Sequence, residues 1–212
     1  MLKCRNTLSL SIAAACLTFA ASPLAVASNS NAKVTDSTIM THINAQQEAA
    51  QMVSAQVHLV ETLDARKAMA GRQFEAVVDK TVHLKDGTEL PHGTVLVGKV
   101  AVDQMHSAGT SRLALLFTEA KLRDGKTVPI RATIAGVASP ADYATGYMSG
   151  AEPPPAWNRA TLQIDQIDAL NDIDLHSSIG GTNSGVFVTK KKDDVKLQAG
   201  SQLSLAIAAQ KS

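Results

Sequence analysis

The stretch LALLFTEAKLRDGKTVPIRATI, residues 113–134, decides the fold. Apolar residues alternate with polar or smaller residues on both sides of its central Asp-Gly pair, which is the pattern of strands with one buried face. Asp-Gly between two such runs is a strong hairpin signal, because both central residues of a type I′ turn need positive φ. The stretch therefore predicts two antiparallel strands joined by a two-residue type I′ turn at Asp124-Gly125.

The same hairpin signal occurs a second time, earlier in the chain. Residues 84–91 read LKDGTELP and residues 122–129 read LRDGKTVP. Asp-Gly turns recur in many β proteins, but here the match extends over the flanking apolar residues and the following proline. We expect two equivalent hairpins, and no tandem repeat, because the surrounding residues diverge.

Short alternating runs of the same kind continue along the chain at roughly ten-residue spacing. They lie at residues 57–60, 74–78, 82–84, 95–102 and 203–207. Each run would bury one face and leave the other in water. The pattern predicts an all-β protein, an antiparallel modified barrel or sandwich with a short N-terminal helix.

Residues 1–27 have the form of a secretory signal peptide. Lys3 and Arg5 give a short positive region, and residues 8–21 are apolar except for small polar residues. Ala-Val-Ala at residues 25–27 has the small-x-small pattern of a cleavage site. The apolar stretch is shorter than the roughly 20 residues that a membrane span needs, so it is interpreted as part of the cleaved peptide and not as a membrane anchor. We therefore expect no transmembrane span in the mature chain.

Cleavage near Ala27 would release a periplasmic or secreted protein without cysteine, because Cys4 and Cys16 both lie in the peptide. An alternative is lipoprotein processing before Cys16 with acylation of that residue. Loss of the peptide's two positive charges changes the formal net charge from +1 to −1. A near-neutral chain without a basic block gives no reason to expect nucleic-acid binding.

The chain divides into three parts by texture. After the peptide at 1–27, residues 28–55 predict a polar terminus followed by an amphipathic helix from Asp36 to about Ser54. Residues 56–212 predict the β domain. Within it, residues 160–175 favour strand, turn and strand, and residues 138–158 form a long loop rich in glycine and proline.

This loop contains both tyrosines and the only tryptophan of the chain, Tyr143, Tyr147 and Trp157. Their rings combine apolar area with a polar tip, which suits interfaces and carbohydrate platforms. The loop is therefore the candidate interaction surface. The alternative is that Trp157 folds back as a plug over the end of the barrel.

The sequence predicts no catalytic residues, no metal site and no cofactor. It has no G-x-S-x-G motif and no cysteine nucleophile after Ala27, and its six histidines lack the spacing of a helical zinc site. The four aspartates at 165, 168, 172 and 174 lack the order of an EF-hand loop. They are interpreted as a solvated acidic turn.

Five segments of the chain resemble the β domain of the TrbI-type conjugal-transfer and type IV secretion scaffold proteins. They are FEAVV at 74–78, LPHGTVLVG at 90–98, RLALLF at 112–117, the Asp-Gly turn at 124–125 and GSQLSL at 200–205. The resemblance covers roughly residues 70–135 and 195–208, and it concerns the barrel domain only. It implies a modified β-barrel that acts as a structural part of an envelope complex. That family's membrane anchor and outer-membrane helices have no counterpart here, so a pore role is not implied.

The function expected from these observations is that of an exported, non-enzymatic envelope protein. It would be a structural or protein-interaction module that binds an envelope protein partner or itself. One alternative is a carbohydrate- or small-ligand-binding module that uses the aromatic loop, with a glycan as ligand. Another is a hydrolase whose residues converge only in three dimensions.

Overall fold

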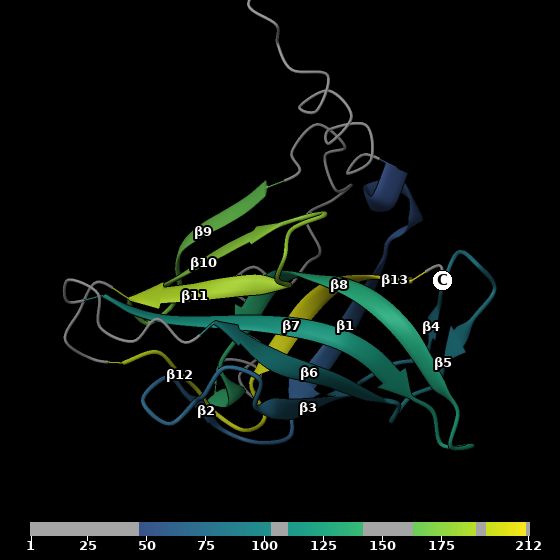
Figure 1. Ribbon diagram of the computed structural model, residues 1–212, viewed down its shortest axis with the longest axis horizontal. Helices are drawn as coiled ribbons and strands as arrows, with labels where there is room; N and C mark the ends of the chain where they lie inside the picture. Colours follow the sequence, from purple (N-terminus) through teal and green to yellow (C-terminus); the bar gives the residue numbers. More distant parts are fainter. Residues whose placement is uncertain (1–46, 103–109, 142–162, 190–193, 211–212) are drawn as a thin grey trace, which may run out of the picture. The chain divides into compact units, whose positions relative to one another are not determined.

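The computed structural model describes residues 47–102, 110–141, 163–189 and 194–210 (Figure 1). All of them lie in one unit of the chain, Thr35–Ser212. Apart from helical turns at residues 47–51 and 140–141, their regular structure is β-strand. The strands are β1 (Val53–Leu59), β2 (Leu63–Asp64), β3 (Gln73–Val78), β4 (Val82–His83), β5 (Glu89–Leu90), β6 (Val95–Val102), β7 (Ser111–Lys121), β8 (Thr127–Ala138), β9 (Gln163–Leu170), β10 (Ile173–Ser178), β11 (Gly185–Thr189), β12 (Lys196–Leu197) and β13 (Gln202–Ala209).

Six of these strands close into an antiparallel barrel. The main sheet has the order β6-β3-β1-β13-β8-β7-β11-β10-β9. An additional pairing of β6 with β7 joins the first and the sixth of these strands and so closes the barrel. Closure satisfies the backbone groups that an open sheet would leave at its edges. The predicted all-β antiparallel fold is confirmed, and of the two architectures left open, barrel and sandwich, the structure is the barrel.

Apolar side chains fill the interior of the barrel. Among the described residues, the largest fully buried side chains on the barrel strands are Phe74, Phe117, Leu59, Leu96, Leu113, Leu115, Ile130 and Ile134, and those on other elements are Phe187, Leu63, Leu90 and Leu175. Phe74 and Phe117 pack edge to face, with ring centroids 5.2 Å apart. Such a pair contributes about 0.5–1.5 kcal/mol beyond the area that it buries. The interior is therefore a packed core and not a lumen.

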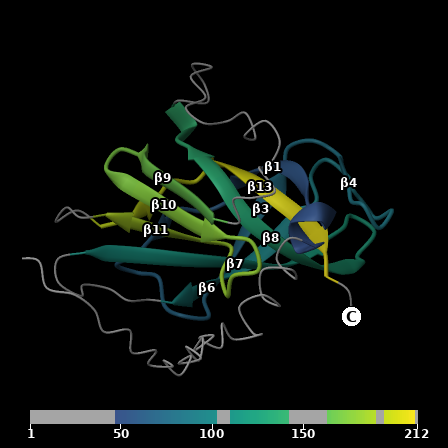
Figure 2. The same ribbon diagram turned by 90° about the horizontal axis from the view of Figure 1, so that it is seen from above.

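The barrel wall forks between β7 and β8. Those two strands pair only near their turn, from Glu119↔Pro129 to Lys121↔Thr127. Farther along, the same edge of β7 pairs with β11 instead. Strands β9, β10 and β11 continue the sheet outside the barrel, and we call them the extension (Figures 1 and 2).

Ser184 bridges the fork. Its N–H donates to Leu115 O at 2.7 Å, and its carbonyl oxygen accepts from the N–H of Ile134 at 2.7 Å. Its hydroxyl oxygen accepts from the N–H of Phe117 at 3.0 Å. One fully buried residue thus provides hydrogen-bond partners for backbone groups of both β7 and β8. Without it, the gap between these strands would leave those buried groups unpaired.

Strand β13 is buried on both faces, unlike the half-wet strand predicted. Its inward face carries Leu203, Leu205 and Ile207, as expected. Its outward face carries Ala206 and Ala208, which pack in a second apolar cluster with Met52, Ala49 and Ile179. The outward face is buried because the helical turn at residues 47–51 and the end of β10 form a second layer over this part of the wall.

A small two-stranded sheet, β2 with β12, packs against the core from outside the main sheet. Leu63 and Leu197 of these strands are buried, as are their neighbours Ala65 and Val195. The N–H of Ala65 donates to Val195 O at 2.9 Å. This contact joins residue 65 to a segment 130 positions later, so the sheet ties two distant parts of the chain together.

The two Asp-Gly hairpins are equivalent, but the predicted type I′ turn is wrong. Gly87 and Gly125 have φ of 91° and 85°, whereas neither aspartate is among the described residues with positive φ. The N–H groups of the two glycines donate to Leu84 O and Leu122 O, at 3.1 and 3.0 Å. Each loop therefore has three residues, a type I turn followed by a left-handed glycine.

Two other sequence predictions have clear outcomes. The helix expected from Asp36 to about Ser54 is wrong at its end, because helical structure stops at residue 51 and β1 begins at Val53. Val53 pairs with Ile207, so strand pairing overrides the helical pattern there. Residues 36–46 lie outside the described part. The strand, turn and strand expected at 160–175 is confirmed by β9 and β10.

Candidate functional site

Residues 142–158 of the predicted interaction loop lie outside the described residues. Its three aromatic residues, Tyr143, Tyr147 and Trp157, belong to the range 142–162 that the structure does not describe. Its flanks are described, because β8 ends at Ala138 and β9 begins at Gln163. The loop's role in binding stays a prediction.

A histidine–aspartate pair lies on the outer surface of the barrel. Nδ1 of His58, on β1, lies 2.5 Å from Oδ1 of Asp79, the residue that follows the end of β3. Asp79 Oδ2 accepts from Gln202 Nε2 at 2.9 Å, and the backbone oxygen of Asp79 lies 2.9 Å from His92 Nδ1. These contacts fix Asp79 between two strands and a turn. The arrangement is that of a surface network that ties β1, β3 and β13 together.

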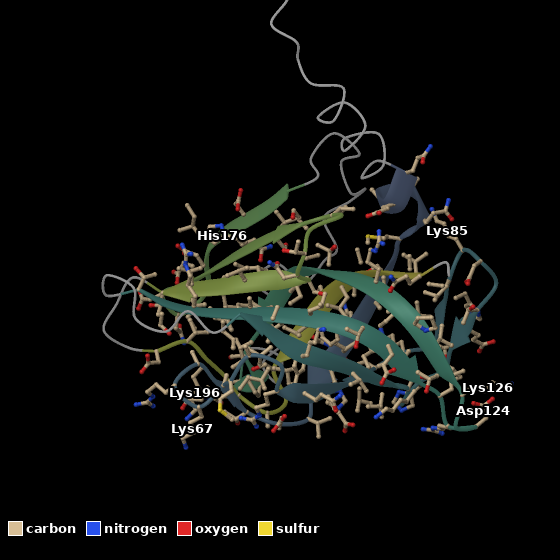
Figure 3. The ribbon with its side chains drawn as sticks, viewed as in Figure 1. Lys67, Lys85, Asp124, Lys126, His176 and Lys196 are labelled. Carbon is tan, nitrogen blue, oxygen red and sulfur yellow. The ribbon has the colours of Figure 1, made fainter. Side chains whose placement is uncertain are left out.

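A second pair lies on the extension. His176 of β10 and Asp165 of β9 are directly opposite each other, with 2.7 Å between Nδ1 and Oδ1. Figure 3 shows where His176 lies on the extension. They line a hollow of about 320 Å³ together with Ser177, Ser178, Asn183 and Val186. Ser177 Oγ donates to Ile134 O at 2.6 Å, so that hydroxyl is engaged with the barrel wall. The hollow is polar and open, which suits the binding of a charged side chain.

A groove of about 330 Å³ separates the helical turn from the barrel. It is lined by the turn, by Lys85 and Asp86 of the first Asp-Gly hairpin, and by residues 208–210 at the end of β13. Glu48 forms an ion pair with Arg131 of β8 across it. Lys85 Nζ donates to Ala50 O at 2.5 Å, and Figure 3 shows Lys85 beside the turn. Its charged groups thus hold the helical turn against the barrel.

The aspartates at 165, 168, 172 and 174 lie on the β9–β10 hairpin. The N–H of Asp168 donates to Asp174 Oδ1 at 2.9 Å, and the N–H of Asp172 donates to Asp168 Oδ1 at 2.6 Å. The carboxylates of Asp168 and Asp174 therefore accept from the hairpin's own backbone. Among the described residues, no group of three or more His, Cys, Asp or Glu side chains is arranged to hold a metal ion.

The same hairpin exposes an apolar residue that the sequence did not single out. Ile167 has 84% of its surface exposed. In the sequence it sits in QIDQIDAL, where its apolar character suggests a buried position. The signal missed is the spacing of Ile164 and Ile167, because residues three apart point to opposite faces of a strand.

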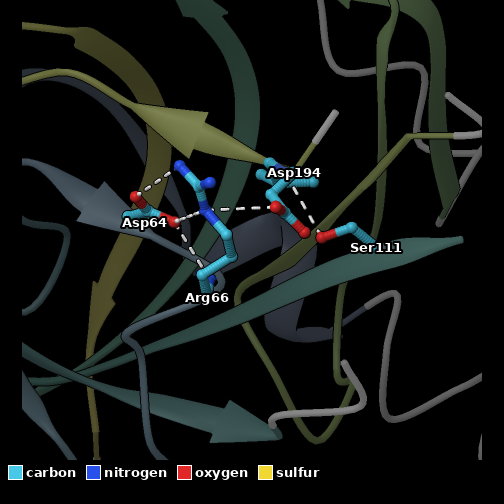
Figure 4. A network of polar contacts seen from close by, with 5 residues as sticks. Asp64, Arg66, Ser111 and Asp194 are labelled. Atoms are coloured by element: carbon cyan, nitrogen blue, oxygen red, sulfur yellow. Dashed lines mark hydrogen bonds and ion pairs between the residues drawn. The ribbon is translucent and has the colours of Figure 1, made fainter. Parts of the chain in front are cut away.

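An ionic network holds β2 beside the segment that precedes β12 (Figure 4). Arg66 Nε lies 3.4 Å from Asp64 Oδ1 and 3.1 Å from Asp194 Oδ2, so the guanidinium sits between two carboxylates. Ser111 Oγ accepts from the N–H of Val195 at 3.3 Å. Burial acts to raise the pKa of Asp64, but hydrogen bonds and charge from Arg66 outweigh it and hold that pKa below its ordinary value of 3.8. The network is structural, since it joins the two strands that cover the core.

The comparisons with known proteins give remote structural likeness only. No protein-family model and no curated protein matches the sequence. Among solved structures, the chain is similar to that of ComB10 of the Com type IV secretion system of Helicobacter pylori, at 10% identity and a TM-score of 0.36. The match covers 75% of this chain and 88% of that chain. A likeness this remote carries no argument about function, which must be argued from the chain's own fold and surface.

Proposed function

We propose that this chain is an exported, non-enzymatic module of the cell envelope that acts through contacts with another envelope protein. One observation carries the proposal, the closed six-stranded barrel with an interior filled by apolar side chains. A packed interior offers no space for a substrate, so recognition falls to the outer surface. The extension enlarges that surface without adding to the wall of the barrel.

The TrbI-type resemblance supports a scaffold role. The five segments that carry it fall on or beside the barrel wall, on β3, β6, β7, the turn before β8, and β13. The resemblance therefore concerns the residues that build the barrel, and scaffold proteins of that type use such a domain structurally. By analogy, this chain is a barrel module that assembles with an envelope component.

Export is part of the proposal. It rests on the peptide at residues 1–27 and predicts cleavage near Ala27, with a periplasmic or secreted product. In the described part of the chain, no helix is long and apolar enough to cross a membrane. Acylation at Cys16 is the alternative, and the mass spectrometry described next distinguishes it from cleavage near Ala27.

The test has two readouts on the full chain expressed with a C-terminal tag in a bacterial host. Mass spectrometry of the purified product is expected to show Ser28 as its first residue, and osmotic shock is expected to release it. Crosslinking in intact cells of the source organism is expected to yield a discrete complex that contains the tagged chain and an envelope protein. An unprocessed cytoplasmic chain would overturn export, and a chain that stays uncrosslinked in the envelope would overturn the assembly role.

A third readout addresses the binding-module alternative. Saturable quenching of Trp157 fluorescence by a panel of soluble glycans would favour a carbohydrate module that uses the loop with Tyr143 and Tyr147. The proposal expects no saturable quenching. Because Trp157 is the only tryptophan of the chain, the fluorescence reports on that loop alone.

A further inference from the structure

Strand β9 is the last strand of the main sheet. One of its edges pairs with β10, from Gln163↔Ser178 to Gln166↔Leu175. No strand of the described residues pairs with its other edge, and Figure 2 shows β9 at the outer border of the extension. An unpaired edge presents backbone N–H and C=O groups that an added strand can bond.

Strand β9 carries an exposed apolar residue beside a register shift. Between Gln166 and Leu170, three residues of β9 stand opposite the single residue Asp174 of β10. Asp168, within this bulge, has φ of 57° and donates its N–H to Asp174 Oδ1, so the bulge is fixed by its own hydrogen bond. Ile167 lies two residues after the exposed Asp165, on the same face of the strand, and its exposed fraction exceeds those of Met69 at 69% and Val60 at 51%.

Asp165 stands two residues before Ile167 and contributes to the hollow of about 320 Å³. Its side chain is 62% exposed and lies against His176. A strand added to β9 would place one side chain directly opposite Asp165, at about 5 Å between Cβ atoms. A long cationic side chain at that position can reach the Asp165 carboxylate.

The negative charge of this edge favours a cationic partner strand over a second copy of β9. Residues 163–178 contain four aspartates and no lysine or arginine. Pairing of β9 with β9 of a second copy would bring Asp165 and Asp168 close to the same residues of the partner, and like charges across strands are destabilising. A strand with cationic side chains gains attraction at the same positions, together with faster, salt-dependent association.

We propose that the edge of β9 left unpaired by the described strands binds an extended segment of another protein by strand addition, with a Lys or Arg of that segment against Asp165 and an apolar side chain against Ile167. This inference rests on the proposed function, because it names the surface and the chemistry of the partner. Backbone hydrogen bonds supply affinity, while the cation and the apolar residue, spaced by two, supply specificity.

The test is fluorescence anisotropy with the full chain and the labelled peptide Thr-Val-Thr-Arg-Thr-Val-Thr-Arg-Thr, which places Arg and Val two residues apart on one face. The matched probe has Glu in place of both Arg residues. The Arg peptide is expected to bind about ten-fold more tightly, with weaker binding at high salt. The Asp165→Lys variant is expected to reverse this preference, and Ile167→Thr to weaken both peptides. Val60→Thr, a second exposed apolar residue, is the control and is expected to leave both affinities unchanged.

Equal binding of the two peptides by the wild-type chain, or an unchanged preference in Asp165→Lys, would overturn the inference. Sedimentation that shows a dimer lost in Asp165→Lys would assign the edge to a second copy. Peptide binding that occurs only after Lys190, Lys191 and Lys192 are changed to Ser would show that this chain's own lysine segment occupies the β9 edge. Either result would also overturn the inference.

Crosslinking in cells separates this inference from the proposed function. A wild-type complex that persists in Asp165→Lys and Ile167→Thr would reject the β9 edge while the assembly role stands. Absence of a wild-type complex would reject the assembly role itself, whatever the peptides do. Loss of the complex in these two variants, but not in Val60→Thr, is the expected result.

Discussion

Phe74 and Phe117 meet edge to face inside the barrel, with an angle of 72° between their ring planes. Gly98 of β6 lies between them in the sheet, because Phe74 on β3 and Phe117 on β7 are its two partners across the strands. A Cβ atom at residue 98 would stand 2.4 Å from Phe74 Cζ and 2.9 Å from Leu116 O. Closure of the barrel through β6 therefore requires a residue without a side chain at this position.

Gly98→Ala is expected to destabilise the protein by about 1–3 kcal/mol, which is the usual cost of overpacking a core. Without the clash, alanine in a strand interior would be more favourable than glycine. Urea unfolding measures the change as a lower midpoint at unchanged slope. In the double variant Phe74→Leu with Gly98→Ala, the loss is expected to be smaller than the sum of the two single losses. Simple additivity would show that the ring of Phe74 is not what excludes a side chain here.

Ser184→Ala is expected to lower the free energy of unfolding by about 1–3 kcal/mol, because it leaves the buried N–H of Phe117 without its acceptor. Thermal unfolding followed by circular dichroism gives the magnitude. Hydrogen exchange at the amide of Phe117 gives the location, and exchange there is expected to accelerate more than at other barrel amides. Ser54→Ala, at an exposed serine of β1, is the matched control and is expected to be near neutral. Similar losses in both variants would contradict the role assigned to the fork.

The strands of the barrel were predictable from the sequence because their alternation is local. The segments around Phe74, Leu113 and Leu203 all form strands with the predicted residues buried. Closure was not predictable, because it depends on the pairing of β6 with β7 and on a fork bridged by Ser184, a residue 67 positions from Phe117. A serine in a Gly/Ser-rich segment carries no sign of such a role.

The candidate site was less predictable than the fold. The sequence directed attention to Tyr143, Tyr147 and Trp157, which the described residues do not include. Ile167 escaped notice although it lies three residues after Ile164, a spacing that puts the two on opposite faces of a strand. The pairing of Asp165 with His176 depends on the register of β9 against β10, which the sequence does not show. Composition can suggest an acidic turn, but it does not show which side chains face one another.

Gly87→Ala and Gly125→Ala are expected to cost the same, about 1 kcal/mol each, because both positions are left-handed and open. Their φ values are 91° and 85°, and a Cβ atom at either would meet nothing within 4 Å. The effect is therefore backbone strain alone. Chemical denaturation of the two variants tests the equivalence of the hairpins. Gly71→Ala, at φ of 84° with equally open surroundings, is a reference outside them. A much larger loss at one hairpin would show that the two turns differ.

Asp64→Asn is expected to destabilise the protein by about 1–3 kcal/mol at neutral pH, because it weakens charged hydrogen bonds with Arg66. Arg66 holds the pKa of Asp64 below its ordinary 3.8 in the folded protein, despite the opposing effect of burial. The ionised carboxylate therefore stabilises the fold above pH 3.8. This contribution is lost as the pH falls from 3.8 through the lowered pKa, since the unfolded chain takes up the proton first. Urea unfolding at a series of pH values is thus expected to show a gap between wild type and variant that is constant near neutrality and narrows in acid.

The control for this pH dependence is Asp124→Asn. The pKa of Asp124 is also lowered, by the backbone N–H of Lys126 and by its ammonium group, but Asp124 lies on an exposed hairpin turn. Solvent and salt screen such a pair, so added salt is expected to reduce the Asp124 effect more than that of Asp64. A gap for Asp64→Asn that stays constant down to the lowest pH would show that the charge of Asp64 does not hold β2 against the segment before β12. The packing of Leu63 and Leu197 would then be sufficient to keep that sheet on the core.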